Sequence, residues 1–204
     1  MDDNLYKKAL NLEYFTVGYN ALEGFFSVFF GANAGSIALI SFGLDSMVES
    51  LSGLIIIWRL RKPEMCSGCE ERTSENKAIK FVAATFFFLG AYVLYESANK
   101  LIFREIPEPS LPGLIIAILS LIIMPILSFK KRDLGMKINS RALVADSKET
   151  LACAYLSVSL LLGLTTNYFF GFWQADSLVG LIVVMFLIRE GREWWEEANN
   201  SEDE

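Results

Sequence analysis

The chain has 204 residues, enough for one domain. Hydrophobic residues make up 53% of it, and the mean hydropathy is +0.38. The charged residues gather at a few places and leave long stretches almost without charge, which argues against a soluble enzyme, a disordered tail and a disulfide scaffold. A net charge of −6 gives no basic footprint for nucleic acid, and the absence of His removes the commonest general base and metal ligand.

The N-terminal stretch MDDNLYKKAL is polar and lacks the form of a cleaved signal peptide, so we expect it to belong to the mature protein. Six apolar segments follow it. In chain order they cover residues 12–31, 36–58, 78–101, 111–129, 141–168 and 174–190.

The first five segments reach the roughly 20 residues that a helix needs to cross a bilayer. The sixth is shorter but begins after Phe172 and Trp173, whose rings suit a membrane interface. In lipid a segment must satisfy its own backbone hydrogen bonds, which favours helices. The sequence therefore predicts an all-α membrane protein, with six transmembrane helices within residues 1–192 and an acidic cytoplasmic tail over 193–204.

Lysine and arginine predict the orientation of these helices. If the N-terminus is cytoplasmic, only Lys100 and Arg104 fall outside. The inside positions are Lys7, Lys8, Arg59, Arg61, Lys62, Arg72, Lys77, Lys80, Lys130, Lys131, Arg132, Lys137, Arg141, Arg189 and Arg192. This positive-inside bias places both termini in the cytoplasm, and we expect the protein in the cell membrane.

Two acidic residues interrupt the second apolar segment. Asp45 and Glu49 stand four residues apart in GLDSMVES, so both carboxylates lie on one face of a helix. Like charges at this spacing repel each other, and burial in lipid makes the repulsion more costly. A divalent cation bound between them would offset their charges and so reduce both the repulsion and the cost of burial. The alternative is a pair of protonated or hydrogen-bonded acids that specify helix packing.

The fifth segment carries a matching set. Asp146, Glu149 and Cys153 in ADSKETLACAY fall at i, i+3 and i+7, again on one face. Two such helices could present four groups to one ion: Asp45, Glu49, Glu149 and Cys153. Carboxylates with a thiolate suit Zn²⁺, whereas carboxylates alone suit harder ions such as Mn²⁺. Asp146 lies near the end of its helix, so capping or cation entry competes with ligation, and Cys153 is equally well explained as a small core residue.

Further polar side chains occur in the apolar segments. They can line an aqueous path, but we favour interhelical hydrogen bonding or support of the ligands. We expect Lys148 to extend to the inner membrane surface, with pairing to an acid on another helix as the alternative. The polar residues in question are Glu13, Asn20, Glu23, Tyr92, Tyr95, Glu96, Asn99, Gln174 and Asp176.

The loop after the second segment contains Cys66-Ser-Gly-Cys69. A single CxxC is weak evidence for a metal or redox site, and a solvated loop explains it as well. It leaves open a membrane thiol oxidoreductase that uses Cys66 and Cys69, although the predicted cytoplasmic placement disfavours disulfide chemistry.

Four stretches together resemble the membrane domain of the cation diffusion facilitator family of divalent-metal exporters. The residues that carry the resemblance are GSIALISFGLDSMVES, LGAYVLYESANKLI, SRALVADSKETLACA and WQADSLVGL, within about residues 10–190. The offsets of the family's ligands fall on Asp45, Glu49, Glu149 and Cys153, where the last two replace the usual His or Asp. The chain resembles short members that keep only the membrane part.

The resemblance implies a secondary transporter, not an enzyme, that exports a divalent cation in exchange for protons. Metal and protons compete for the same carboxylates, because ligands must be deprotonated to bind. The expected cargo is Zn²⁺, with Mn²⁺, Fe²⁺, Co²⁺, Ni²⁺ and Cd²⁺ as alternatives, and no prosthetic group is expected. The expected partners are metal ions, protons and the lipid bilayer. A homodimer is an open alternative, and nucleic acid is not expected. A transporter or sensor of another cation, and a structural membrane protein, remain alternatives.

Overall fold

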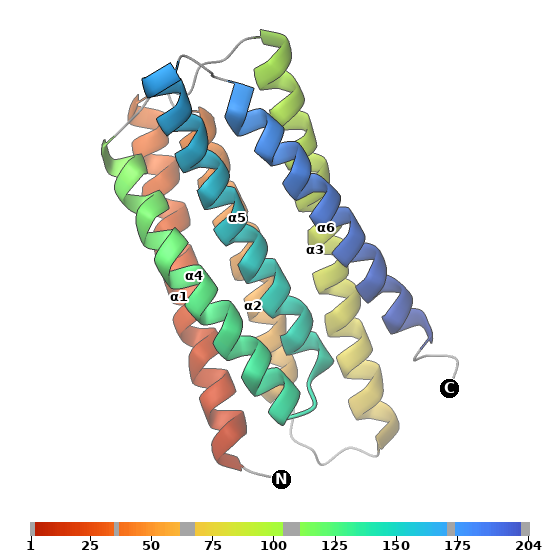
Figure 1. Cartoon of the computed structure of the whole chain (residues 1–204). Helices are drawn as coiled ribbons and strands as arrows, with labels where there is room; N and C mark the ends of the chain where they lie inside the picture. Colours follow the sequence, from red (N-terminus) through yellow and green to blue (C-terminus); the bar gives the residue numbers. More distant parts are fainter. Residues whose placement is uncertain (1–2, 35–36, 62–67, 104–110, 171–173, 201–204) are drawn as a thin grey trace.

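The computed structural model describes residues 3–34, 37–61, 68–103, 111–170 and 174–200. Within these ranges the chain forms six α-helices and no strand, as the sequence predicts (Figure 1). The helices are α1 (Asp3–Ala34), α2 (Ile37–Arg61), α3 (Gly68–Phe103), α4 (Leu111–Lys137), α5 (Arg141–Phe170) and α6 (Gln174–Asn200).

The helices run up and down in one bundle. α1, α2, α4 and α5 form one group, and α3 lies along α6 on its side (Figure 1). We call these the four-helix group and the α3–α6 pair. The N-terminus and the end of α6 lie toward the same end of the bundle, and we call it the termini end.

Hydropathy separates the helices into two sets. Three are long and apolar enough to span a membrane by length and composition: Leu39–Arg61, Thr73–Phe103 and Leu111–Lys137. α1, α5 and α6 carry more polar residues, many of them buried against the rest of the bundle. A buried polar side chain lowers the hydropathy of a helix without exposing that side chain to lipid.

α6 is longer than its expected span. It continues through Asn200, so most of the stretch expected to form an unordered acidic tail is helical. Pairs spaced i, i+4 support this extension: Arg189 Nε lies 2.8 Å from Glu193 Oε1, and Arg192 Nη2 lies 3.7 Å from Glu196 Oε1. Trp194 and Ala198 of the same segment are buried against the bundle. Packing on one face therefore stabilises a segment whose composition alone indicates disorder.

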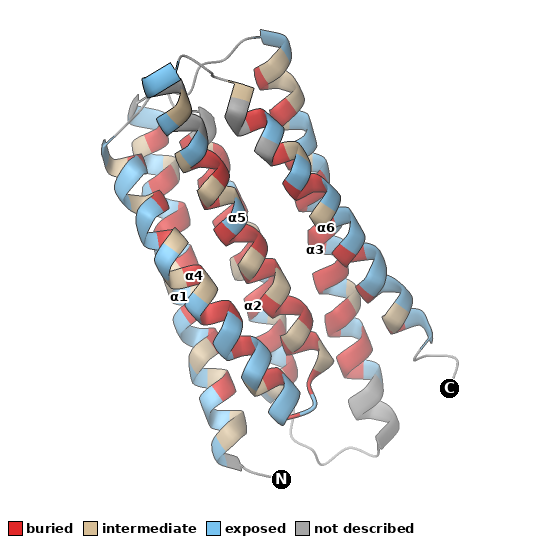
Figure 2. Ribbon diagram, viewed as in Figure 1, coloured by how far each residue is buried: buried red, intermediate tan, exposed pale blue. Residues whose placement is uncertain are grey.

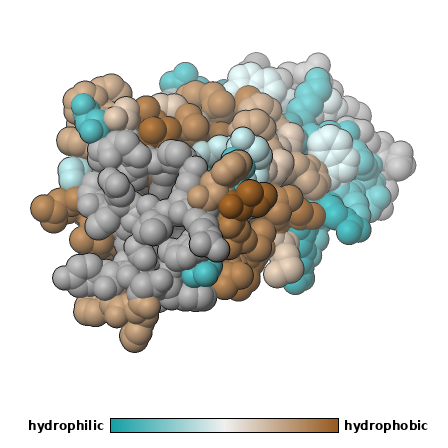
Figure 3. Space-filling view, turned by 90° about the horizontal axis from the view of Figure 1, so that it is seen from above, coloured by the Kyte–Doolittle hydropathy of each residue, from teal (hydrophilic) through white to brown (hydrophobic). Residues whose placement is uncertain are grey.

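The outer surface of the bundle is apolar. Large hydrophobic side chains point outward from all six helices, among them Phe25, Leu54, Phe88, Ile122 and Phe169. Buried residues face the bundle interior (Figure 2). Seen from above, hydrophobic side chains cover much of the visible face, and hydrophilic ones gather toward one side (Figure 3). An apolar exterior around a polar interior is the arrangement expected of a protein surrounded by lipid.

Glycine allows α1 and α2 to approach closely. A Cβ atom at Gly43 would lie 2.8 Å from the backbone oxygen of Gly24 and 2.9 Å from Ser27 Cβ. Lower on the same helix, a Cβ at Gly53 would lie 2.6 Å from Val17 Cγ2. Small residues at a helix contact let backbones approach, and Gly43 and Gly53 serve this purpose on α2.

A tight turn joins α4 and α5 at the termini end. Asn139 adopts a left-handed conformation with φ of 54°, which Asn tolerates better than most residues. Ser140 caps α5 by accepting a hydrogen bond from Leu143 N at 3.3 Å. Glu75 of α3 adds a second cap, because its Oε1 accepts from Ala142 N at 2.8 Å and from Ser140 Oγ at 2.9 Å. These contacts fix the start of the helix that carries three of the predicted site residues.

Candidate metal-cation site

All five predicted site residues are buried inside the bundle. Asp45 and Glu49 of α2 are each 3% exposed, and Asp146, Glu149 and Cys153 of α5 are at most 2% exposed. Two further carboxylic side chains, Glu13 and Glu23 of α1, are also buried in this region. We call these six acids the acid column: Glu13, Glu23, Asp45, Glu49, Asp146 and Glu149.

The part of the column farthest from the termini end pairs α2 with α5. The Cys153 thiol lies beside the Asp45 carboxyl. Glu49 and Glu23 are close enough to interact electrostatically with both of these groups. The structure therefore brings Asp45 and Cys153 together, as the helical spacing predicts.

Glu49 and Glu149 lie in the middle of the column, and they interact electrostatically with each other. Among the described residues, their carboxylate oxygens and Asp45 Oδ2 have no hydrogen-bond donor with normal distance and angle. Thr150 lies near Glu49, and Ser52 lies near Glu149. Burying ionised carboxylates without donors is costly, so a cation or bound protons must offset their charge.

Asp146 differs from these acids because both of its oxygens have partners. Oδ1 accepts a hydrogen bond from Ser52 Oγ at 2.7 Å, and Oδ2 forms an ion pair with Lys131 Nζ. The Ser52 contact joins α2 to α5, and the Lys131 contact joins α4 to α5. Capping, cation entry and ligation were open for Asp146 in the sequence, and both of its oxygens already have side-chain partners here.

Lys131 is the residue that sequence reasoning missed. The positive-inside pattern groups Lys131 with the cytoplasmic cations, yet its side chain is fully buried. Besides Asp146, its Nζ lies 3.3 Å from Glu13 Oε1 of α1. The signal available in the sequence was periodicity: Lys131 lies three and four residues after the buried Ser128 and Leu127. Its neighbours Lys130 and Arg132 are exposed.

Polar residues of α1 support the acids, as expected. Ser46 Oγ donates to Glu23 Oε2 at 2.9 Å, and Tyr19 Oη donates to Glu23 Oε1 at 3.0 Å. Asn20 is fully buried near Glu49. These contacts hold α1 against α2 at the level of the acid column.

Lys148 pairs with an acid on another helix, which is the alternative that the sequence left open. It forms an ion pair with Glu190 of α6 and lies over the Trp194 ring, 5.2 Å from the ring centroid. Cys66 and the side chains of Cys69 and Asp176 lie outside the described part of the chain.

In the described ranges, no three Asp, Glu or Cys side chains lie close enough together to hold one ion at once. The predicted ligands instead follow one another along the column, from Asp45 and Cys153 through Glu49 to Glu149. These side chains would therefore have to come closer together to surround one cation.

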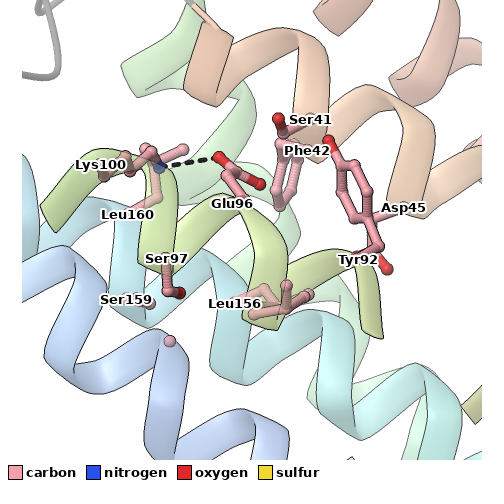
Figure 4. Close-up of a pocket in the computed structure, with 12 residues that line it drawn as sticks. Ser41, Phe42, Asp45, Tyr92, Glu96, Ser97, Lys100, Leu156, Ser159 and Leu160 are labelled. Atoms are coloured by element: carbon pink, nitrogen blue, oxygen red, sulfur yellow. Dashed lines mark ion pairs between the residues drawn. The ribbon is translucent and has the colours of Figure 1, made fainter. Parts of the chain in front are cut away.

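A polar cavity of about 50 Å³ adjoins the column at Asp45 (Figure 4). It lies between α2, α3, α5 and α6, and its polar wall includes Ser41, Tyr92 and Ser159. Glu96 and Lys100 stand in it as an ion pair, with Lys100 Nζ 2.8 Å from Glu96 Oε1. The cavity lies on the side of Asp45 away from the termini end, and apolar residues such as Phe42 and Leu156 complete its wall.

Comparison with known proteins points to cation transport. A family model described as the cation efflux transmembrane domain matches residues 15–198, most of the chain and all six helices in part. An uncharacterized transporter of Methanocaldococcus jannaschii is 28% identical over 174 residues, covering 83% of this chain and 61% of that protein.

Two further relatives agree with this match. Transmembrane protein 163 of Xenopus laevis is 23% identical over 189 residues, covering 92% of this chain and 66% of the relative. An uncharacterized transporter of Synechocystis is 24% identical over 154 residues, covering 74% of this chain and 50% of the relative. The matched region thus spans between half and two thirds of these relatives. Because the family model covers most of its length, the chain belongs to the cation efflux family and contains that family's transmembrane domain.

Proposed function

We propose that this chain is a secondary transporter that moves a divalent metal cation across the membrane in exchange for protons. The observation that carries the proposal is the pair of buried acids Glu49 and Glu149, which interact electrostatically and lack hydrogen-bond donors among the described residues. Membership of the cation efflux family supports the part of the proposal that concerns cation transport. The buried acids support the part that places the ion inside the bundle, because they would stabilise a doubly charged ion there.

The proposed ligands are Asp45, Glu49, Glu149 and Cys153, with Asp146 as a supporting neighbour. Carboxylate oxygens and a thiolate form a donor set that suits Zn²⁺, and Mn²⁺, Fe²⁺, Co²⁺, Ni²⁺ and Cd²⁺ are alternatives. Lys131 contacts only Glu13 and Asp146 of the six buried acids as an ion pair, so the acids of the column repel one another unless a cation or protons bind. An empty and unprotonated site is therefore suppressed, and this suppression couples metal movement to proton movement.

The proposed orientation places the termini end in the cytoplasm. Lys7, Lys8, Lys130 and Lys137 lie toward this end, whereas Lys100 lies toward the opposite one. In this proposed orientation the cavity lies on the outer side of Asp45, and the Lys131–Asp146 ion pair lies toward the cytoplasm. We propose that the α3–α6 pair moves against the four-helix group to alternate access.

The test is cation flux into proteoliposomes under an imposed pH gradient, with Zn²⁺, Mn²⁺, Fe²⁺, Co²⁺, Ni²⁺ and Cd²⁺ as the panel. Asp45→Asn and Glu49→Gln keep side-chain size while removing a charge, so each should reduce flux at least about a hundredfold, as expected when a ligand is lost. Asp133→Asn is the matched control, because that acid is exposed on α4 and should leave flux unchanged. Undiminished flux in both column variants would contradict the proposal.

A further inference from the structure

Lys131 occupies a place that calls for an explanation. A lysine side chain without exposure is rare, because an ammonium group loses its hydration when it is buried. Here the group is held between Glu13 of α1 and Asp146 of α5, so one side chain of α4 connects three helices. Its charge also acts on Glu49, one of the proposed ligands.

Lys131, Glu13 and Asp146 form an ion triad, and its position matters as much as its charge. The triad lies at the termini end of the acid column, and Glu49 and Glu149 lie farther from that end. At the opposite end the column meets the polar cavity next to Asp45. A cation that reached the column from the termini end would meet Asp146 and Glu13 with an ammonium group already between them.

We propose that Lys131 is a tethered cation of the transport path: it occupies Asp146 and Glu13 and thereby limits the cation to the ligands above them. This inference rests on the proposed function and names a positioning residue for it. The ammonium group contacts both acids and offsets one of their charges, so the two acids no longer form a free second binding place. It also lowers the affinity of the neighbouring ligands by direct repulsion, which favours release of the cargo.

Replacing Lys131 with Met keeps the length of the side chain and removes its charge. A unit charge within Coulombic range of a divalent ion changes its affinity by about tenfold or more. We therefore expect K131M to bind Mn²⁺ and Cd²⁺ at least about tenfold more tightly, with a lower apparent KM and a lower maximal rate in proteoliposomes. K131R keeps the charge and should retain a KM close to that of the wild type.

The chain offers a matched control at the adjacent position. Lys130 lies on the same helix and is exposed, so K130M removes the same charge from the outside of the bundle. It should leave both affinity and rate unchanged. Removing one partner of a buried ion pair can also prevent folding, and the double variant K131M/D146N addresses this because it removes both charges. It should fold and bind more tightly than the wild type, since Glu13 and Glu49 lose their cation.

The experiment measures Mn²⁺ and Cd²⁺ binding to purified full-length protein, together with flux of the same ions. Tighter binding with slower flux in K131M or in the double variant, but not in K130M, supports the tethered cation. Wild-type affinity and KM in folded K131M, or in the double variant if K131M does not fold, would overturn this inference alone. A wild-type protein that neither binds nor transports any ion of the panel would overturn the proposed function, and this inference with it.

Discussion

Two buried glutamates on facing helices, Glu49 and Glu149, have no hydrogen-bond donor with normal geometry in the part of the chain described. Each could be predicted from the sequence, because an acid in an apolar helix is costly unless it has a function. Their mutual proximity follows from the matching i, i+4 spacing on the two helices. Their lack of donors could not be predicted, because it depends on which hydroxyls the other helices bring near.

Cys153 allows a test at the level of one atom. If its sulfur contributes to cation binding, Cys153→Ala should weaken Cd²⁺ and Zn²⁺ transport about tenfold or more while changing Mn²⁺ transport much less, because thiolates prefer soft ions. The measurement is flux of each ion in proteoliposomes. An equal effect on soft and hard ions would reduce Cys153 to a packing residue beside Asp45.

Ser52 is expected to hold Asp146 in place. Ser52→Ala removes the buried hydrogen bond from Ser52 Oγ to Asp146 Oδ1 and should lower the free energy of unfolding by about 1 kcal/mol or more. Ser50→Ala is the matched control, because Ser50 Oγ donates only to the backbone of its own helix, at Ser46 O. Equal destabilisation of the two variants in chemical denaturation would contradict this role.

Lys131 shows where residue-level prediction fails. Counting Lys and Arg identifies the end of a helix but not the direction of each side chain, so the count cannot separate Lys131 from its exposed neighbours. For Asp146 the sequence leaves ligation, helix capping and cation entry open. In the structure Ser52 and Lys131 are the partners of its two oxygens, which the sequence does not indicate.

At the scale of the helices the sequence was a good guide. Six helices and the contact faces of Gly43 and Gly53 could be predicted from hydropathy and small residues. The extension of α6 to Asn200 could not, because it depends on Trp194 and Ala198 packing on the bundle. From its acidic composition alone, residues 193–204 were expected to form a tail beyond the last helix.

The close approach of α1 and α2 gives a prediction for glycine. Gly43→Ala would push a methyl group against the Gly24 backbone, which cannot move aside easily, and should destabilise the protein by about 1–3 kcal/mol. Gly18→Ala on α1 is the matched control, since a Cβ there meets nothing within 4 Å. Comparable thermal stability of both variants in detergent would show that the helices can separate without cost.

The start of α5 depends on a residue of another helix. Glu75 of α3 accepts hydrogen bonds from Ser140 and Ala142 and forms an ion pair with Arg59 of α2. Glu75→Gln removes the charge but not the shape, and we expect faster amide exchange in the first turn of α5. Glu196→Gln, on the exposed face of α6, should leave that exchange unchanged. Unaltered exchange in Glu75→Gln would show that this contact does not stabilise the start of α5.

At the scale of the whole molecule, polar contacts between the α3–α6 pair and the four-helix group gather toward the termini end. Arg59 pairs with Glu75, Lys148 pairs with Glu190, and Arg141 Nη2 donates to Asn76 Oδ1 at 2.9 Å. Toward the other end, the cavity at Asp45 lies between the same two parts. These ion pairs and the cavity at Asp45 therefore lie at different levels of the boundary between the two parts.

The most direct measurement is the location of the cation itself. Crystals of the full chain grown with Cd²⁺ or Mn²⁺, and examined by anomalous scattering, should show the ion inside the bundle between α2 and α5. The account predicts that oxygens of Asp45, Glu49 and Glu149 surround it, and that Asp45→Asn removes it. Anomalous density confined to exposed acids such as Glu193 and Glu196, with the space between Glu49 and Glu149 empty at saturating metal, would contradict the account.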